Sequence, residues 1–133
     1  MCLIVKNKWH KDGKPLIAEK NLPVFKVLHK DIRRGLETPV FEYPIVFTDG
    51  KATMESELFV VKSICEKNLY LCYNGIHAYL NRLSSRELRW KFTRRNTSVY
   101  KAIIPKGAEY LIGNNGDIVS TKMIIFDKRR YEK

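Results

Sequence analysis

Ile103-Ile104-Pro105-Lys106-Gly107-Ala108-Glu109-Tyr110 is the stretch that decides the fold of this chain. Its apolar and aromatic residues stand on both sides of a Pro-Lys-Gly turn, in which proline fixes the entry and glycine relieves steric strain. The Asn114-Asn115-Gly116 motif that follows is typical of a tight hairpin loop that requires positive φ. The stretch therefore predicts a strand over 97–104, a continuation over 109–112 and a long returning strand over 117–126.

The first half of the chain predicts further, shorter strands. Residues 24–29 are mostly apolar and β-branched and follow a proline, which predicts a strand. Residues 39–47 alternate loosely around Pro44, which indicates an edge strand or a bulge. Residues 57–64 and 68–73 favour strands, with a helical turn left open for 57–64. Residues 16–18 form a short strand or one helical turn, and Asp49-Gly50 is a turn signal.

One segment carries helix signals. Ser84 and Glu87 form a capping box, and Leu88 and Phe92 then fall on one helical face. These signals predict a helix over about 85–93. We therefore expect an α+β fold, with a mainly antiparallel, strongly bent sheet and one clear helix. Residues 1–133 form a single globular domain, with a frayed basic tail from about residue 128.

Composition places the chain among globular proteins, because 44% of its residues are hydrophobic. It contains no apolar run long enough for a membrane span, and the apolar run at Cys2–Val5 is too short for a signal peptide. We therefore expect a cytoplasmic protein. Cys2, Cys65 and Cys72 show no metal-ligand spacing and are expected to be reduced and metal-free, and no cofactor motif is present.

The net charge of +11 indicates an anionic partner, which is either nucleic acid or a nucleotide-like ligand. Arginines reach phosphates, and the exposed aromatic ring of a neighbouring Trp90 or Tyr100 can stack on a base. The candidate polyanion-binding residues are Arg82, Arg86, Arg89, Arg94 and Arg95. The alternative is a solvated surface that keeps a small protein soluble, with Trp90 covering the core.

His77 is the leading candidate for an active role, since Gly75 before it permits close backbone approach and Tyr79 shares its strand face. Lys106 is presented by its turn and can hold a phosphate as a point charge. The candidate ligand-binding residues at this polar corner are His77, Tyr79, Lys106, Tyr110 and Ser120. The alternatives are a histidine satisfied by backbone groups and an exposed turn lysine. Lys26 and Tyr43 either line the same pocket or pack in the core.

Topology predicts that His77 and Lys106 lie close together. The strand before the helix and the strand after it are expected in one sheet, adjacent or one apart. Because the surrounding segments resemble hairpins, we expect these two strands to be antiparallel, which brings His77 and Lys106 to one corner.

Several short motifs resemble a group of small uncharacterised proteins of bacteriophages and Bacteroides-type gut bacteria. The motifs are Met1-Cys2-Leu3, Ala18-Glu19-Lys20-Asn21-Leu22, Thr38-Pro39-Val40, the Gly-x-His-Ala-Tyr at 75–79, and the Ile-Pro-Lys-Gly-x-x-Tyr at 104–110. The resemblance implies a phage or mobile-element origin and no mechanism. Those proteins often carry Gly-Phe-His-Ser-Phe where this chain has Ile76, Ala78 and Tyr79 around its histidine, so the resemblance implies no serine chemistry here.

The end of the chain also resembles the ADP-ribosyltransferase fold, in which a strand, a Pro-Lys-Gly-type turn and a returning strand follow one another. That resemblance implies a nucleotide cleft with His and Tyr. The returning strand of those enzymes supplies a catalytic glutamate, whereas this chain offers Asp117 near the start of its strand.

Three functions remain. The leading one is a phage-type, non-catalytic basic protein that binds an anionic partner. The second is a small nucleotide-processing enzyme, similar to ADP-ribosyltransferases, with His77 and Tyr79 as catalytic candidates. The third is a virion or host-interaction protein, in which the positive charge serves docking to an acidic surface.

Overall fold

The computed structural model describes residues 3–6, 8–31, 35–37, 45–64, 66, 69–81, 97–114 and 116–127. These residues form antiparallel strands and one 3₁₀ turn, η1 (Lys11–Gly13). The strands are β1 (Leu3–Ile4), β2 (Leu16–Ile17), β3 (Leu22–Asp31), β4 (Gly35–Glu37), β5 (Lys51–Glu55), β6 (Val60–Lys62), β7 (Tyr70–Cys72), β8 (Ile76–Tyr79), β9 (Thr97–Ile104), β10 (Glu109–Ile112), β11 (Asp117–Ser120) and β12 (Lys122–Phe126).

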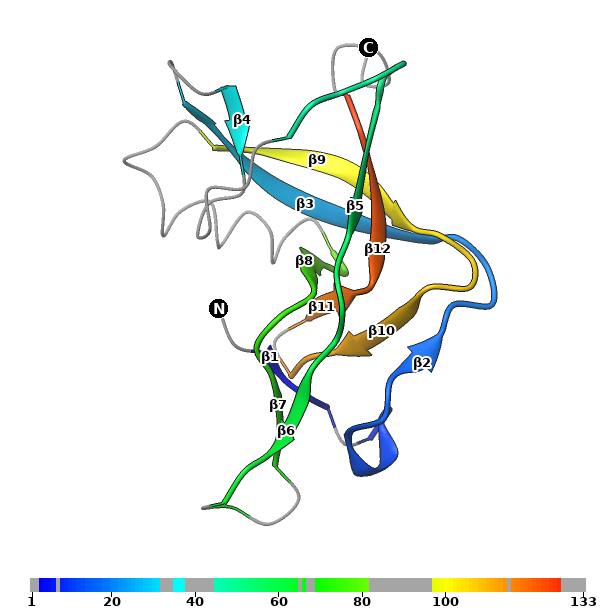
Figure 1. The fold of residues 1–133 in the computed structure, drawn as a ribbon, viewed down its shortest axis with the longest axis vertical. Coiled ribbons are helices and arrows are strands. Elements are labelled where there is room, and N and C mark those ends of the chain that lie inside the picture. Colours follow the sequence, from blue (N-terminus) through cyan, green and yellow to red (C-terminus); the bar gives the residue numbers. More distant parts are fainter. Residues whose placement is uncertain are drawn as a thin grey trace.

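The strands form one large and one small sheet (Figure 1). The large sheet has the order β2-β10-β11-β8-β3-β9-β12-β5, with β4 paired to β3. The small sheet has the order β1-β7-β6. An isolated antiparallel bridge between Val5 and Gly113 joins the small sheet to the end of β10.

The expected α+β class is wrong for the described part of the chain, which is all-β. The helix expected over about 85–93 lies in the segment 82–96, outside the described residues. Its capping box is a local signal of one short segment. The fold class is decided by the alternating strand patterns and turn residues of the rest of the chain.

The segment 103–110 behaves as its turn chemistry predicts. β9 ends at Ile104, the turn places Gly107 at φ 91°, and β10 follows from Glu109. β10 and β11 then pair as a hairpin around Gly116, which has φ 76°. The Asp49-Gly50 turn is also confirmed, since both residues have positive φ between the bridged Thr48 and Lys51.

The returning strand is broken where the sequence predicts one strand. β11 ends at Ser120 and β12 begins at Lys122, so that β11 pairs with β10 and β8 whereas β12 pairs with β9 and β5. The Ser120 hydroxyl donates to the Lys122 carbonyl at 2.9 Å, and the Thr121 hydroxyl accepts from the Glu109 amide at 3.1 Å. These bonds hold the chain at the bend that separates the two halves of the sheet.

The main core fills one face of the large sheet. Buried side chains of β3, β8, β9, β11 and β12 meet there, among them Val24, Leu28, Ala78, Ile118 and Ile125. A second cluster joins the inner face of the small sheet to β10 and β11 through Leu3, Cys72, Leu111 and Val119. Each buried Val, Leu or Ile side chain of these clusters contributes about 1.5–3 kcal/mol.

The imidazole of His10 fastens the N-terminal loop to the large sheet. It is fully buried, its Nε2 accepts from the Ile112 amide at 2.8 Å, and its Nδ1 lies 2.9 Å from the Lys14 carbonyl. Nε2 therefore carries a lone pair and Nδ1 carries the proton, which is the neutral ring. Burial lowers the pKa of His10 below its ordinary value of 6.5.

We predict that acid weakens this fold through His10. A folded pKa below the unfolded one means that the unfolded chain binds more protons, so the stabilisation is complete above about pH 6.5 and is lost as the pH falls below it. In the His10→Asn variant, the loss of unfolding free energy between pH 6.5 and 5.5 should be smaller by about 1 kcal/mol. Urea unfolding at the two pH values measures it, with His77→Gln as the control. An unchanged pH dependence in His10→Asn would contradict the assignment.

Candidate functional site

His77 and Tyr79 lie on the same face of β8, as the sequence predicts. Their ring centroids are 5.2 Å apart with the rings nearly perpendicular, which is a favourable edge-to-face arrangement. The opposite face of β8 carries Ile76 and Ala78 into the main core. Tyr79 packs instead with Val27 and Val99 in a separate small cluster. The polar pair thus occupies the face of the sheet that does not carry the main core.

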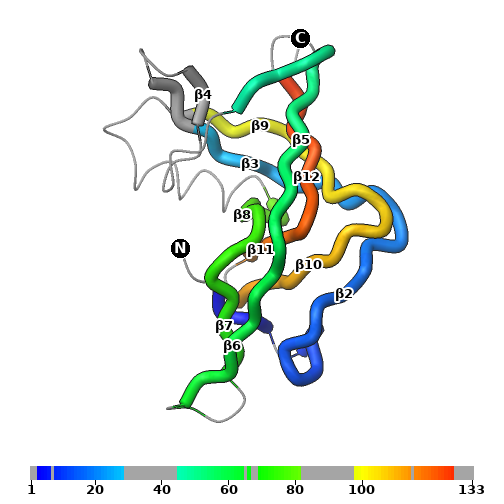
Figure 2. The backbone as a smooth tube through the Cα atoms, viewed as in Figure 1, coloured from blue at the N-terminus to red at the C-terminus, as the bar shows by residue number. Residues whose placement is uncertain are grey.

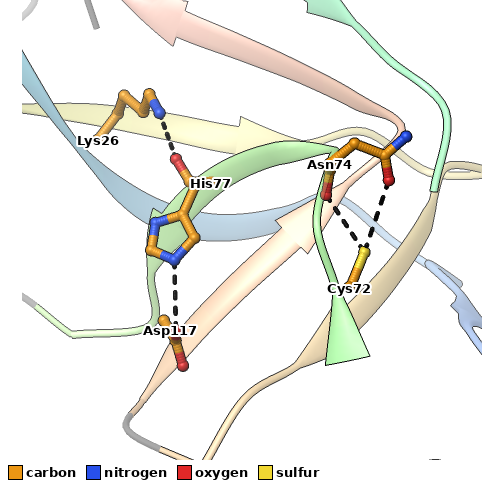
Figure 3. Close-up of polar contacts among 5 residues, drawn as sticks. All are labelled: Lys26, Cys72, Asn74, His77 and Asp117. Carbon is orange, nitrogen blue, oxygen red and sulfur yellow. Dashed lines mark hydrogen bonds and ion pairs between the residues drawn. The ribbon is translucent and has the colours of Figure 1, made fainter. Parts of the chain in front are cut away.

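Asp117 supplies the carboxylate that orients His77. In the antiparallel register of β8 and β11, Asp117 lies opposite Tyr79 and Val119 lies opposite His77. The Nε2 atom of His77 is 3.3 Å from Oδ2 of Asp117, and both side chains are mostly buried (Figure 3). Because a carboxylate accepts, we assign the ring proton to Nε2. Nδ1 then carries the lone pair that can accept a proton.

The environment of Asp117 is tight and incompletely hydrogen-bonded. Its Oδ1 atom is buried and has no hydrogen-bond partner among the described residues. A Cβ atom placed on Gly113 would lie 2.1 Å from this oxygen, so glycine at position 113 gives the carboxylate its room. Burial, together with the charge of Asp117, raises the pKa of Tyr79 to about 12, which keeps the phenol protonated. An unpaired buried oxygen is the group that a bound donor would satisfy.

Lys26 of β3 contacts the main chain of His77 from the main-core face of the sheet. Its ammonium donates to the main-chain carbonyl of His77 (Figure 3). Alternation along β3 places its side chain on the face that carries Val24 and Leu28. β3 and β8 pair only through Phe25 and Tyr79, and the continued register would set Val27 opposite His77. The ammonium therefore binds the carbonyl at the point where the two strands diverge. Burial alone lowers the pKa of Lys26 from 10.5 to about 8.

The antiparallel relation predicted for β8 and β9 is wrong, so it no longer supports placing His77 and Lys106 together. β8 and β9 are one apart in the sheet, as expected, but both are antiparallel to β3 and therefore run parallel to each other. Lys106 lies exposed in the turn between β9 and β10, where its amide binds the Asn21 side chain at 3.0 Å. The sequence prediction extrapolated from the antiparallel hairpins on either side. It did not foresee that β3, which comes much earlier in the chain, lies between β8 and β9 and makes them parallel.

The side chains of Tyr110 and Ser120 lie on the opposite face of the sheet from that of His77. They are opposite each other in the β10–β11 register, and Ser120 is opposite Ile76, whose side chain enters the main core. Ser120 is fully buried and uses its hydroxyl in the bend before β12. Of the five candidate ligand-binding residues, the structure therefore brings together His77 and Tyr79.

The predicted polyanion surface falls mostly in segments that the structure does not describe. Arg82, Arg86, Arg89, Arg94, Arg95 and Trp90 lie outside the described residues. Tyr100, the other proposed stacking ring, is buried and stacks on Phe47 with ring centroids 5.9 Å apart. It is therefore not the exposed aromatic that base stacking requires.

The thiol of Cys72 is buried, and its Sγ lies 3.2 Å from the Asn74 carbonyl (Figure 3). Cys2, Cys65 and Tyr43 lie outside the described residues. Within the described ranges, no group of three or more His, Cys, Asp or Glu side chains is arranged to hold a metal ion. In that same part of the chain, no helix has the length and apolar character needed to cross a membrane.

No protein-family model, curated protein sequence or solved structure matches this chain. The chemistry of the site therefore rests on its own geometry.

Sequence reasoning missed the roles of Asp117 and Lys26. The hairpin signal at 114–116 predicts the pairing of β11 with β10, but no local signal predicts its pairing with β8, which sets Asp117 beside His77. The one sequence signal for Lys26 was its place as the single charge within an apolar strand pattern over 24–28.

We predict that Lys26 lowers the stability of the fold at neutral pH. Its folded pKa lies below the unfolded value, so the penalty is full below about pH 8 and is relieved as the pH rises toward 10.5. Unfolding free energy should rise by about 2 kcal/mol between pH 8 and 9.5 in the natural chain and stay flat in Lys26→Met. At pH 7 the variant should be more stable by about 1–2 kcal/mol, after the loss of the bond to His77 is subtracted.

The matched control is Lys101→Met, which removes an exposed lysine from the adjacent strand β9. It should keep the pH dependence of the natural chain. A Lys26→Met variant that is less stable than the natural chain at pH 7 would show that the ammonium contributes net stability, against this prediction.

Proposed function

We propose that this protein binds an anionic polymer, nucleic acid in the first place, through its arginine-bearing segments, with the β-sheet as their scaffold. The observation that carries the proposal is the partition of charge. All nine arginines lie in three short stretches of the sequence, 33–34, 82–95 and 129–130, whereas lysines and carboxylates nearly balance over the rest of the chain. The net charge of +11 therefore belongs almost entirely to a few short segments.

The described strand ends that these segments join support the proposal. Residues 32–34 follow β3, residues 82–96 precede β9, and residues 128–133 follow β12. His29 pairs with Thr97, and β12 runs in the same direction as β3 because both are antiparallel to β9. The end of β3, the start of β9 and the end of β12 therefore lie at one end of the molecule, at the top of Figure 1. Cationic segments that are joined to neighbouring strand ends are suited to bind one polyanion together.

The charge proposal predicts a specific salt dependence. Replacing Arg86, Arg89 and Arg94 together by glutamine should weaken binding to a labelled single-stranded oligonucleotide. The slope of log K against log salt should fall by about 0.7 for each phosphate that is no longer neutralised. The matched control replaces Lys8, Lys11 and Lys14, which are exposed in the N-terminal loop, by glutamine. It removes the same charge and should leave the slope nearly unchanged. Equal effects of the two triple variants would show that net charge alone acts and would refute the proposed surface.

A second candidate function is favoured by the His77–Asp117 pair. An imidazole whose Nε2–H is held by a carboxylate presents Nδ1 as a general base. No serine, threonine or cysteine side chain of the described residues is hydrogen-bonded to His77, so a substrate that carries its own nucleophile suits the site best. RNA is such a substrate. His77 would take the proton of a 2′-hydroxyl, whose oxygen bonds to the adjacent phosphorus as the bond from phosphorus to the 5′-oxygen breaks and water protonates the leaving oxygen.

This second candidate predicts slow cleavage of RNA to a 2′,3′-cyclic phosphate and a 5′-hydroxyl. Asp117→Asn should lower the rate by at least about a hundredfold, because the ring loses the carboxylate that fixes its tautomer. His77→Gln should abolish cleavage, and Lys101→Met, purified in the same way, should not change it. An oligonucleotide with deoxyribose at the cleaved position must remain intact. Equal cleavage by His77→Gln and the natural chain, or no cleavage by the natural chain, would remove this candidate.

A further inference from the structure

The small sheet buries one face and exposes the other. Its inner face carries Leu3, Cys72 and Val60 into the second core cluster. The register sets Val61 and Ile4 on either side of Leu71, and its continuation by one residue sets Phe59 opposite Tyr73. The side of the small sheet opposite to its inner face is called the outer face. It carries the side chains of Ile4, Phe59, Val61, Leu71 and Tyr73.

The outer face is exposed and apolar. Phe59 is 65% exposed, Tyr73 56%, Val61 45% and Ile4 39%, and Leu71 is half-buried. Contiguous apolar surface with aromatic side chains is typical of interaction sites in proteins. Its backbone is fixed by the ladder to β7 and by the bond from the Phe59 amide to the Asn74 side chain at 2.6 Å. The apolar side chains of the outer face are therefore held in place by a hydrogen-bonded backbone.

The charges beside the outer face are self-complementary. Glu57 is exposed and precedes Phe59 by two residues on the β6 side, and Lys6 follows Ile4 by two residues on the β1 side. β6 and β1 are the two outer strands of this sheet, so the acid and the base flank the apolar residues at opposite corners. A two-fold axis perpendicular to the line between these corners exchanges them. It sets Glu57 of each copy against Lys6 of the other while the apolar side chains meet.

The rest of the molecule permits this approach. The β6–β7 hairpin lies at the bottom of Figure 2, at the far end of the long axis from the end of β12. The strand ends that carry the arginine-bearing segments therefore point away from the contact, which limits repulsion between two chains of charge +11.

We propose that the outer face of the β1-β7-β6 sheet is the contact surface of a symmetric homodimer, with Glu57 of each copy paired to Lys6 of the other. The experiment is sedimentation equilibrium of the full chain from low to high micromolar concentration, with near-UV circular dichroism to establish that each variant is folded. The natural chain should dimerise, and a Phe59→Ser/Tyr73→Ser variant should remain monomeric. The matched control is Val46→Ser, which removes an apolar side chain that is 77% exposed outside this face.

The charge variants test the arrangement itself. Glu57→Lys and Lys6→Glu should each weaken dimerisation about tenfold, since each sets like charges against each other, and their combination should restore it. A monomeric natural chain would overturn the proposal. So would a double charge variant that dimerises no more tightly than either single variant, or a Phe59→Ser/Tyr73→Ser variant that dimerises as tightly as Val46→Ser.

Discussion

The ladder between β3 and β9 is the constraint on which the rest of the structure depends. It pairs Leu22 through His29 with Ile104 through Thr97 without interruption, and its alternating side chains supply the main core on one face and the Tyr79 cluster on the other. Because β8 joins the opposite edge of β3, the ladder also fixes β8 parallel to β9. The pairing joins segments far apart in the chain, so loop closure must precede it and its folding is expected to be slow.

Lys26 lies in the middle of that ladder, opposite Tyr100. We predict that the burial of its ammonium lowers the unfolding free energy at neutral pH. An apolar side chain of similar length would fill the same space without the cost of desolvating an ammonium. Its hydrogen bond goes to the carbonyl of His77, the residue that Asp117 orients from the other side. His77 is thus contacted by a buried ammonium, whose desolvation costs free energy, and by a carboxylate with one unpaired oxygen. Such unfavourable buried polar groups are typical of functional sites, where residues are kept although they lower the stability of the fold. Substitution of His77 distinguishes the two proposed functions, since polyanion binding through the arginines does not require His77 and RNA cleavage does.

The extent to which sequence predicted the structure follows the range of each signal. Turn residues act locally, so the strand over 97–104, the Pro-Lys-Gly turn and the β10–β11 hairpin are confirmed. The break between β11 and β12 was missed because Thr121 accepts from the Glu109 amide only once β10 and β11 have paired, and the local bond from Ser120 to Lys122 is no recognisable sequence signal. The pairing of His77 with Tyr79 follows from alternation along one strand and was predictable. The pairing of His77 with Asp117 depends on register across the sheet, for which one sequence holds no signal.

The outer face and the arginine-bearing segments act together if both proposals hold. A dimer joined through the outer face carries at its opposite ends the two sets of strand ends that the arginine-bearing segments join. A long nucleic acid that reaches both ends binds the second set as an intramolecular step, which raises avidity without new contacts. A short oligonucleotide reaches one end and gains nothing. Dependence of affinity on polymer length in the natural chain, absent from the monomeric Phe59→Ser/Tyr73→Ser variant, is therefore the property that links the outer face to the arginine segments.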